Sequence, residues 1–288
     1  MALDSRKVTL APFNYVDKFT LSGGSYTAAK PLALAQTRDL GEFARTTDAT
    51  TGSTQLLMTF DKRRTIGFVG IYVHNLSTDA TVRVYVRDAA DATVYDSGAF
   101  PAWPPVLGLH QVAWQDPNWW SRQPSEEDRA QYKAFAWHAF EPVATAYSVL
   151  LEIQDPNNSD GYVEFARLIV SDLWQPTWNM EWDNAWGYDP TTKVEAGDQP
   201  GVEFFQEGPN RRTFTFELGG LDVQEAFDQI ARMQNVLGIS GEIVVAHELA
   251  DTPQRYSRTM VARLTQLDPI RHPNTVFHRT GMALLELI

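Results

Sequence analysis

Tryptophan is the residue type in this 288-residue sequence best suited to binding a ligand. All nine tryptophans lie between Trp103 and Trp186, and several fall in residues 100–120, FPAWPPVLGLHQVAWQDPNWW. Proline restricts the backbone of this segment, and flat indole faces are surfaces on which sugars and partner proteins stack. The segment therefore predicts either a sugar-binding loop, with Trp103, Trp119 and Trp120 as its contacts, or a small core or interface that shields the rings.

A second group of tryptophans recurs at every fourth residue within RLIVSDLWQPTWNMEWDNAWG, and it consists of Trp174, Trp178, Trp182 and Trp186. That spacing matches a helix, but Pro176 disfavours helical backbone at the preceding residue, and loop-forming residues follow. In an extended chain, residues separated by an even number lie on one face. We therefore interpret the four rings as an apolar stripe that contacts either a second domain or another subunit.

The sequence carries no recognisable catalytic or metal-binding motif. Its six histidines lack the spacing of a zinc site, and there is no nucleophile elbow, phosphate-binding loop or dinucleotide-binding loop. A glycosidase needs two carboxyl groups facing each other across a sugar, and carboxylates scattered along an acidic chain do not indicate that arrangement. The segment DPNNSDG, residues 155–161, resembles the start of a calcium loop but lacks the remaining ligands, which favours a polar turn. We expect no enzyme activity, no catalytic residue, no metal and no cofactor.

Composition argues against two classes of partner. The net charge of −12 opposes a nucleic-acid-binding surface, which needs clustered Lys and Arg. No apolar run reaches the ~18 residues that span a membrane, and the N-terminal residues lack the apolar core of a signal peptide. Without cysteine the fold must be stable without disulfides, which suits synthesis in a reducing cytoplasm. We expect neither nucleic-acid binding nor membrane insertion.

The first part of the chain is a series of short predicted strands. Val82, Val84 and Val86 alternate with Arg and Tyr, which is the period-two pattern of a half-buried strand. Turn sequences separate such runs every 8–12 residues or so, which is typical of a β-sandwich. The predicted strands include residues 65–77, 80–89, 146–156 and 161–172.

The second part combines strands with one helix. Residues 211–220 alternate as a strand, and residues 222–238 predict an amphipathic helix with Asp222 and Glu225 as a capping box and Gly238 as the C-cap. Three further strands complete a small α+β arrangement. The Gly-, Pro- and Thr-rich segment between the two parts predicts a boundary. The expected organisation is a β-sandwich over residues 1–186, a linker or long loop over 187–210, and a β-rich domain with one helix over 211–288.

These segments resemble a known family. TIGFVGIYVHNLSTDATVRVYVRDA, VYDSG and YVEFARLIVSDLWQPTWN are similar to the galactose-binding-like jelly roll of minor tail proteins from long-tailed bacteriophages. RRTFTFELGG and DVQEAFDQIARM are similar to the strand and helix of the tail-type β domain that follows it in those proteins. The resemblance covers most of the chain and implies a mainly β fold: a jelly-roll sandwich followed by a smaller α+β domain.

The resemblance also implies a role. It predicts a structural component of the phage tail tip or baseplate, made in the host cytoplasm and incorporated into the virion. The implied partners are further copies of the chain in a ring and other tail proteins such as the tail tube, hub and fibre. A carbohydrate-binding module for a bacterial surface glycan is the alternative, within or outside a virion, and a glycan-cleaving enzyme is a third reading.

Overall fold

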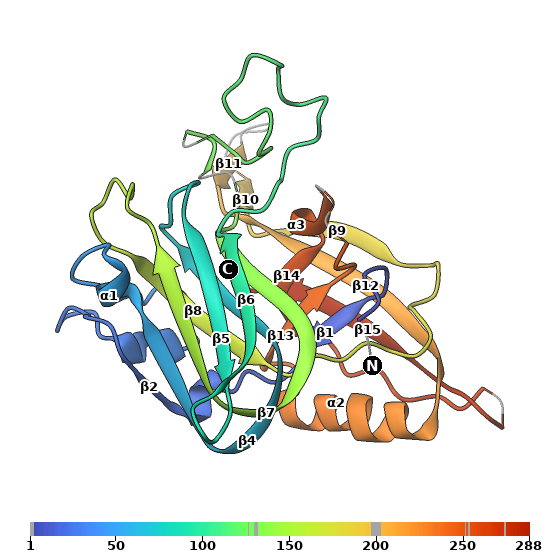
Figure 1. Ribbon diagram of the computed structural model, residues 1–288. Helices are drawn as coiled ribbons and strands as arrows, with labels where there is room; N and C mark the ends of the chain where they lie inside the picture. The colour runs from blue at the N-terminus through green and yellow to red at the C-terminus, as the bar shows by residue number, and fades with distance from the viewer. Residues whose placement is uncertain are drawn as a thin grey trace. The chain divides into compact units, whose positions relative to one another are not determined.

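The computed structural model describes residues 3–125, 127–129, 132–196, 203–250, 252, 254–273 and 275–288. The chain forms two compact units, and it passes back and forth between them (Figure 1). The first unit takes the described residues of 1–6 together with Phe13–Trp174 and Glu248–Arg258. The second unit takes Lys7–Pro12, Gln175–His247 and Thr259–Ile288. Each unit therefore contains a short segment from elsewhere in the sequence.

The first unit is a β-sandwich built around two long strands, β4 (Leu56–His74) and β7 (Phe135–Gln154). The sandwich has two sheets, and each of these strands bends and takes part in both, so the two strands pair with each other twice. Leu56–Thr59 pair with Ser148–Leu151, and Phe68–Tyr72 pair with Phe135–Ala139. The expected jelly-roll sandwich is confirmed. The other elements are η1 (Val16–Lys18), β2 (Thr20–Ser22), η2 (Leu32–Gln36), β3 (Ala44–Arg45), α1 (Thr51–Thr54), β5 (Thr81–Arg87), β6 (Thr93–Pro101), β8 (Glu164–Ser171) and α3 (Gln254–Ser257).

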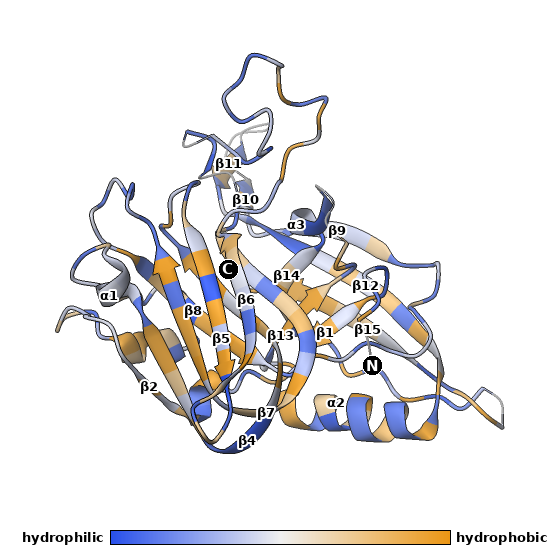
Figure 2. Ribbon diagram, in the orientation of Figure 1, coloured by the Kyte–Doolittle hydropathy of each residue, from blue (hydrophilic) through white to orange (hydrophobic). Residues whose placement is uncertain are grey.

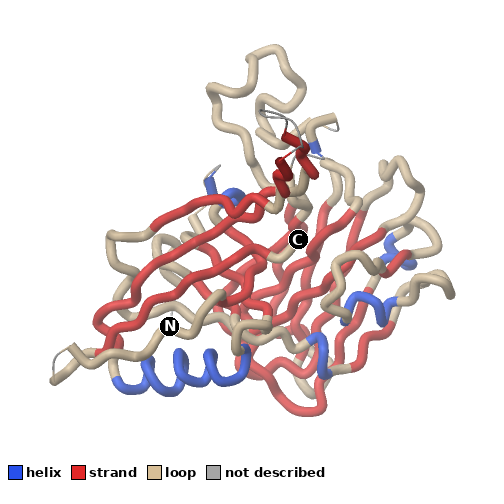
Figure 3. Tube along the Cα trace, turned by 180° about the vertical axis from the view of Figure 1, so that it is seen from behind, coloured by secondary structure: helices blue, strands red, loops and turns tan. Residues whose placement is uncertain are grey.

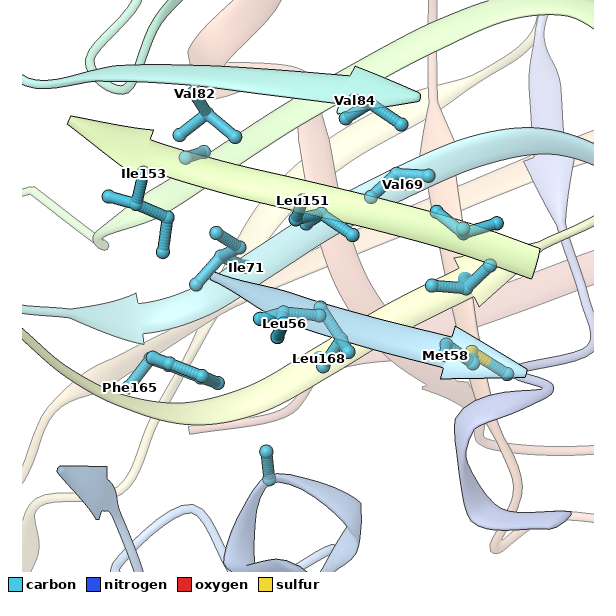
Figure 4. Packing of buried hydrophobic residues seen from close by; sticks show 14 of the residues in the cluster. Leu56, Met58, Val69, Ile71, Val82, Val84, Leu151, Ile153, Phe165 and Leu168 are labelled. Carbon is cyan, nitrogen blue, oxygen red and sulfur yellow. The ribbon is translucent and has the colours of Figure 1, made fainter. Parts of the chain in front are cut away.

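The core of the sandwich lies between its two sheets. In one sheet, β2 pairs with the N-terminal part of β4, which pairs with the C-terminal part of β7, followed by β5 and β6. In the other sheet, the N-terminal part of β7 pairs with the C-terminal part of β4, followed by β8 and β3. The predicted alternation in β5 is confirmed, because Val82, Val84 and Val86 are buried. Figure 4 shows Val82 and Val84 in one cluster with side chains such as Ile71 and Leu168. Burying a side chain of this size contributes about 1.5–3 kcal/mol.

The path of the strands gathers three loops at one end of the sandwich. His74 ends β4 and Thr81 begins β5, Pro101 ends β6 and Phe135 begins β7, and Gln154 ends β7 shortly before β8. The pairing of Thr81 with Pro101 and with Gln154 places these strand ends together. We call this the loop end; it carries the β4–β5 turn (75–80), the β6–β7 loop (102–134) and the β7–β8 loop (155–163). The bends of β4 and β7 occupy the opposite end.

The second unit is an antiparallel sheet of six strands in the order β1-β13-β14-β15-β12-β9, with a separate hairpin of β10 and β11. Hydrophobic residues alternate with polar ones along β12, whereas residues 282–285 of β15 are all hydrophobic. Figure 2 colours these strands by hydropathy. The strands are β1 (Thr9–Ala11), β9 (Ala185–Pro190), β10 (Lys193–Ala196), β11 (Glu203–Gln206), β12 (Asn210–Leu221), β13 (Glu242–Ala246), β14 (Thr259–Leu264) and β15 (His278–Glu286).

The predicted helix of the second unit is present (Figure 3), and its buried face differs in part from the predicted one. The capping box forms, since the backbone N–H of Glu225 donates to Asp222 Oδ1 at 2.7 Å, and Gly238 ends the helix at φ 55°. The first turns are π-type over η4 (Glu225–Ala231), and α2 (Arg232–Leu237) continues them. A π-turn holds more residues than an α-turn, which shifts the following side chains around the axis. Two residues predicted on the buried stripe are exposed: Val223, which precedes the π segment, and Phe227, which lies within it.

The organisation of the chain also differs from the expected division at residue 187. Residues 185–190 form β9 and pair with β12, so part of the expected linker over 187–210 belongs to the sheet. Residues 193–196 pair with residues 203–206, and residues 197–202 between them lie outside the described part of the chain. The glycines and prolines of this segment interrupt regular structure but leave short strands between them.

Candidate functional site

A cavity of about 590 Å³ opens at the loop end of the first unit. The β4–β5 turn and the β6–β7 loop enclose it, and its size lies in the range of small-ligand sites. Hydroxyl, amide and carboxylate side chains dominate the walls, with a few apolar residues among them. The lining residues are Thr78, Asp79, Leu107, Gln111, Val112, Asp116, Pro117, Asn118, Ser121, Gln123, Pro124, Ser125 and Asp128.

Trp103 anchors the base of the β6–β7 loop. Its ring is only 1% exposed and packs edge-on against His74 with 5.5 Å between ring centroids. The indole N–H donates to the backbone carbonyl of Leu76 at 2.9 Å, and Arg129 donates to the same oxygen at 2.9 Å. Gln123 closes the arrangement by donating from Nε2 to the carbonyl of Trp103 at 2.8 Å. These bonds join the two segments that enclose the cavity.

The β7–β8 loop is joined to the same end by a buried carboxylate. Asp155 accepts the backbone N–H of Ser77 at 2.9 Å, the Ser77 hydroxyl, and the side-chain amide of Asn158 at 2.8 Å. Donors thus occupy both carboxylate oxygens, which fits the predicted polar turn better than a calcium loop. Within the described residues, no group of three or more His, Cys, Asp or Glu side chains is arranged to hold a metal ion.

The structure separates the three tryptophans predicted to bind sugar. Trp103 is buried and anchors the loop, so its assignment as a ligand contact is wrong. Trp119 is half-buried and contacts Trp114 edge-on, with ring centroids 6.3 Å apart. Trp120 is 84% exposed, between the cavity-lining residues Asn118 and Ser121. Trp114 is 73% exposed in the same loop and was not predicted, although its proline-rich context could have indicated it.

The predicted stripe of four tryptophans is not continuous. Trp186 lies opposite Phe214 in the pairing of β9 with β12, and the two rings stack at 4.1 Å with 15° between their planes. Trp186 is therefore part of the packing of the second unit's sheet. Trp174 is half-buried, whereas Trp178 is exposed and Trp182 is completely exposed. That Trp178 and Trp182 contact a partner remains a prediction.

Two histidines near the loop end are held neutral. Burial lowers the pKa of His74 to about 3, and the positive charge of Arg129 contributes in the same direction. Burial also lowers the pKa of His138 to about 4, with a smaller effect from Arg255. His138 lies 2.8 Å from the Tyr95 hydroxyl through Nε2 and stacks on Phe100. His138 is thus packed among aromatic side chains.

No helix in the described part of the chain is both long enough and apolar enough to cross a membrane. Searches of protein-family models and of curated protein sequences gave no match.

Solved structures similar to this chain are carbohydrate-binding domains. The lectin domain of lectinolysin, complexed with Lewis b antigen, aligns with a TM-score of 0.36 and 12% identity over 56% of this chain and 98% of that one. A fucose-binding module from Streptococcus pneumoniae gives a TM-score of 0.35 and 13% identity over 56% and 95%. A carbohydrate-binding module from Clostridium perfringens gives 0.34 and 12% over 56% and 99%. These scores are low, and we carry no ligand over from them.

Proposed function

We propose that the loop end of the first unit binds a glycan. The observation that carries this proposal is the position of Trp120: an almost fully exposed indole in the same loop that lines a polar cavity. Exposing such a ring to water costs free energy, which a ligand stacking on it would recover. Trp114 adds a second exposed ring to that loop.

The chemistry of the site matches that of a sugar. A pyranose has an apolar face of C–H groups that packs on an indole and a rim of hydroxyls that needs hydrogen-bond partners. The cavity supplies such partners from side chains that include Asp79, Asn118 and Gln123. Binding without chemical conversion is the activity proposed here.

The proposal is tested by Trp120→Ala in the full chain, with Trp182→Ala as the matched control. Both rings are exposed, and they lie in different units, so neither substitution disturbs a core. Screening on a glycan array identifies a ligand, and calorimetry then measures its affinity. We expect Trp120→Ala to weaken binding about tenfold, corresponding to loss of a stacked ring, and Trp182→Ala to leave it unchanged. Equal affinities for both variants, or no bound glycan on the array, would refute the proposal.

A second candidate function is assembly into a phage tail tip, as the sequence resemblance implies. The β10–β11 hairpin supports it, because Val194, Phe204 and Phe205 are each more than half exposed. Adjacent strand residues point to opposite faces, so Phe204 and Phe205 make both faces of the hairpin apolar. A two-stranded hairpin is marginally stable in isolation and gains from a partner that covers it. The partner would be another copy in a ring or a neighbouring tail protein.

Light scattering and electron microscopy test this second function. A closed ring that Phe204→Ser and Phe205→Ser together convert to monomers would support assembly through the hairpin. A ring that survives both substitutions would contradict it, as would a monomer that stays monomeric when mixed with the other tail-tip proteins. Glycan binding and assembly involve different units and can both hold.

A further inference from the structure

The amide side chains in the cavity are fixed in orientation by their bonds to the backbone. Asn118 donates from Nδ2 to the carbonyl of Gln123 at 2.8 Å, and Gln123 donates from Nε2 to the carbonyl of Trp103 at 2.8 Å. A backbone carbonyl accepts hydrogen bonds only, so the nitrogen of each amide must face it. Each amide oxygen, Asn118 Oδ1 and Gln123 Oε1, is therefore left to accept from a ligand, and each amide nitrogen keeps one further hydrogen.

Carboxylates in the cavity wall add further hydrogen-bond acceptors. Asp79 is exposed at the cavity, and its side chain makes no hydrogen bond or ion pair with any described residue. Asp116 accepts the backbone N–H of Ala113 through Oδ2 at 2.8 Å, and its second oxygen has further capacity. Among the residues given above as lining the cavity, none is Arg, Lys or His. The charged side chains that line the cavity are therefore all carboxylates.

The donor groups on the same walls are uncharged amides and hydroxyls. Gln111 accepts the backbone N–H of Gly108 through Oε1 at 2.7 Å, which leaves its Nε2 hydrogens as donors. Hydroxyls such as that of Ser121 can both donate and accept. The charged groups of the cavity are thus carboxylates, which only accept hydrogen bonds when ionised, and a positively charged donor makes the strongest bonds to them.

We propose that the cavity prefers glycans with free amino groups, such as glucosamine oligomers, over neutral glycans, and that it rejects anionic ones. This inference rests on the proposed glycan-binding function and names its ligand class. An ammonium group donates three hydrogen bonds and carries the charge that the cavity lacks, whereas an N-acetyl group offers one donor and no charge. A uronic acid would place a carboxylate against Asp79 and Asp116, which is unfavourable.

The test is calorimetry on the full chain at about pH 6, where carboxylates are ionised and sugar amines are protonated. The probes are tetramers of β-1,4-linked glucosamine, its N-acetylated form and galacturonate. We expect about tenfold tighter binding of the amine form than the acetylated one and no binding of galacturonate. Asp79→Asn should remove most of that preference, whereas Asp91→Asn should retain it. Asp91 is an exposed carboxylate in the β5–β6 turn, at the end opposite the cavity.

Three outcomes contradict this inference in distinguishable ways. Equal affinity for the amine and acetylated tetramers overturns the ligand class and leaves glycan binding intact. A preference that Asp79→Asn does not reduce, although the variant melts like the parent protein, overturns the role given to the cavity. No binding of any tetramer overturns the inference, and if a glycan array is also negative the proposed function fails with it. A preference that shrinks at high salt supports the inference.

Discussion

The indole N–H of Trp103 donates to the carbonyl of Leu76, 27 residues earlier, at 2.9 Å. This bond holds the start of a long loop against a short turn, and the cavity lies between those two segments. Trp103, which was predicted to contact a ligand, therefore positions the segments around the cavity instead.

Replacing Trp103 tests its role as an anchor. Trp103→Ala removes a buried indole and should lower the free energy of unfolding by about 3–5 kcal/mol. Trp103→Phe keeps much of the apolar volume but loses the donor to Leu76, for which we expect a loss of about 1–3 kcal/mol. Urea denaturation measures both. If Trp103→Ala proved as stable as the parent protein, the ring would not be an anchor.

Asp155 is expected to stabilise the loop end through its three donors. Asp155→Asn replaces one accepting oxygen with an NH₂ group that faces a donor, so we expect a loss of about 1–3 kcal/mol. The same substitution at Asp91 is a matched control, because that side chain is exposed and forms a surface ion pair with Arg87 at 3.1 Å. Surface pairs of this kind contribute about 0–1 kcal/mol. Similar stabilities of the two variants would contradict the prediction.

Stability should fall as the solution is acidified below pH 6.5. His74 and His138 have folded-state pKa values of about 3 and about 4, below their usual value of 6.5. Between those values and 6.5 the unfolded chain binds protons that the folded chain does not, so each histidine contributes stability that is lost as pH falls. The slope is about 1.4 kcal/mol per pH unit for each group.

Urea titrations between pH 6.5 and 5 measure this slope, since most carboxylates stay ionised in that window. His138→Gln should remove roughly half of it while His74 supplies the rest, because a Gln side chain does not titrate. A parent protein equally stable at pH 6.5 and pH 5 would show that neither histidine is held neutral by the fold.

Cutting the chain at the boundary expected from its composition should damage both units. A fragment of residues 1–189 lacks Tyr256, whose hydroxyl donates to the carbonyl of Lys133, and Arg255, which lies over the Trp137 ring at 3.9 Å. A fragment of residues 187–288 lacks β1, the partner of β13. We expect each fragment to be less protected from proteolysis than the same residues in the full chain. Fragments as resistant as the full chain would show that the exchanged segments are dispensable.

Sequence patterns predicted the local elements well because local rules govern them. Alternation in β5 follows from the pleat, and the capping box at Asp222 and Glu225 follows from backbone donors that need partners at a helix start. The π-turns after Glu225 could not be foreseen, because they depend on how the helix packs. Phe227, within these turns, is exposed although an α-helical period places it on the buried face, and Val223, which precedes them, is exposed as well.

The functional residues were harder to predict because exposure is a property of the fold. Trp103 and Trp120 lie in the same proline-rich segment, yet Trp103 is buried and Trp120 is exposed to solvent. The spacing of Trp174 to Trp186 likewise gave no sign that Trp186 would stack on Phe214, a partner distant in sequence. Asp79 carried no motif, and its place at the cavity follows from β4 ending and β5 beginning at the loop end.

The pairing of β1 with β13 also has a consequence during protein synthesis. Thr9 pairs with Ala246, so β1 leaves the ribosome more than 200 residues before its partner strand. At the usual 5–20 residues per second this delay is roughly 10–50 s. For that time Leu10, which ends up fully buried, has no native partner on its own chain. On a crowded polysome β1 could pair with β13 of a neighbouring nascent chain, and such exchanged dimers would become more frequent as the expression rate rises.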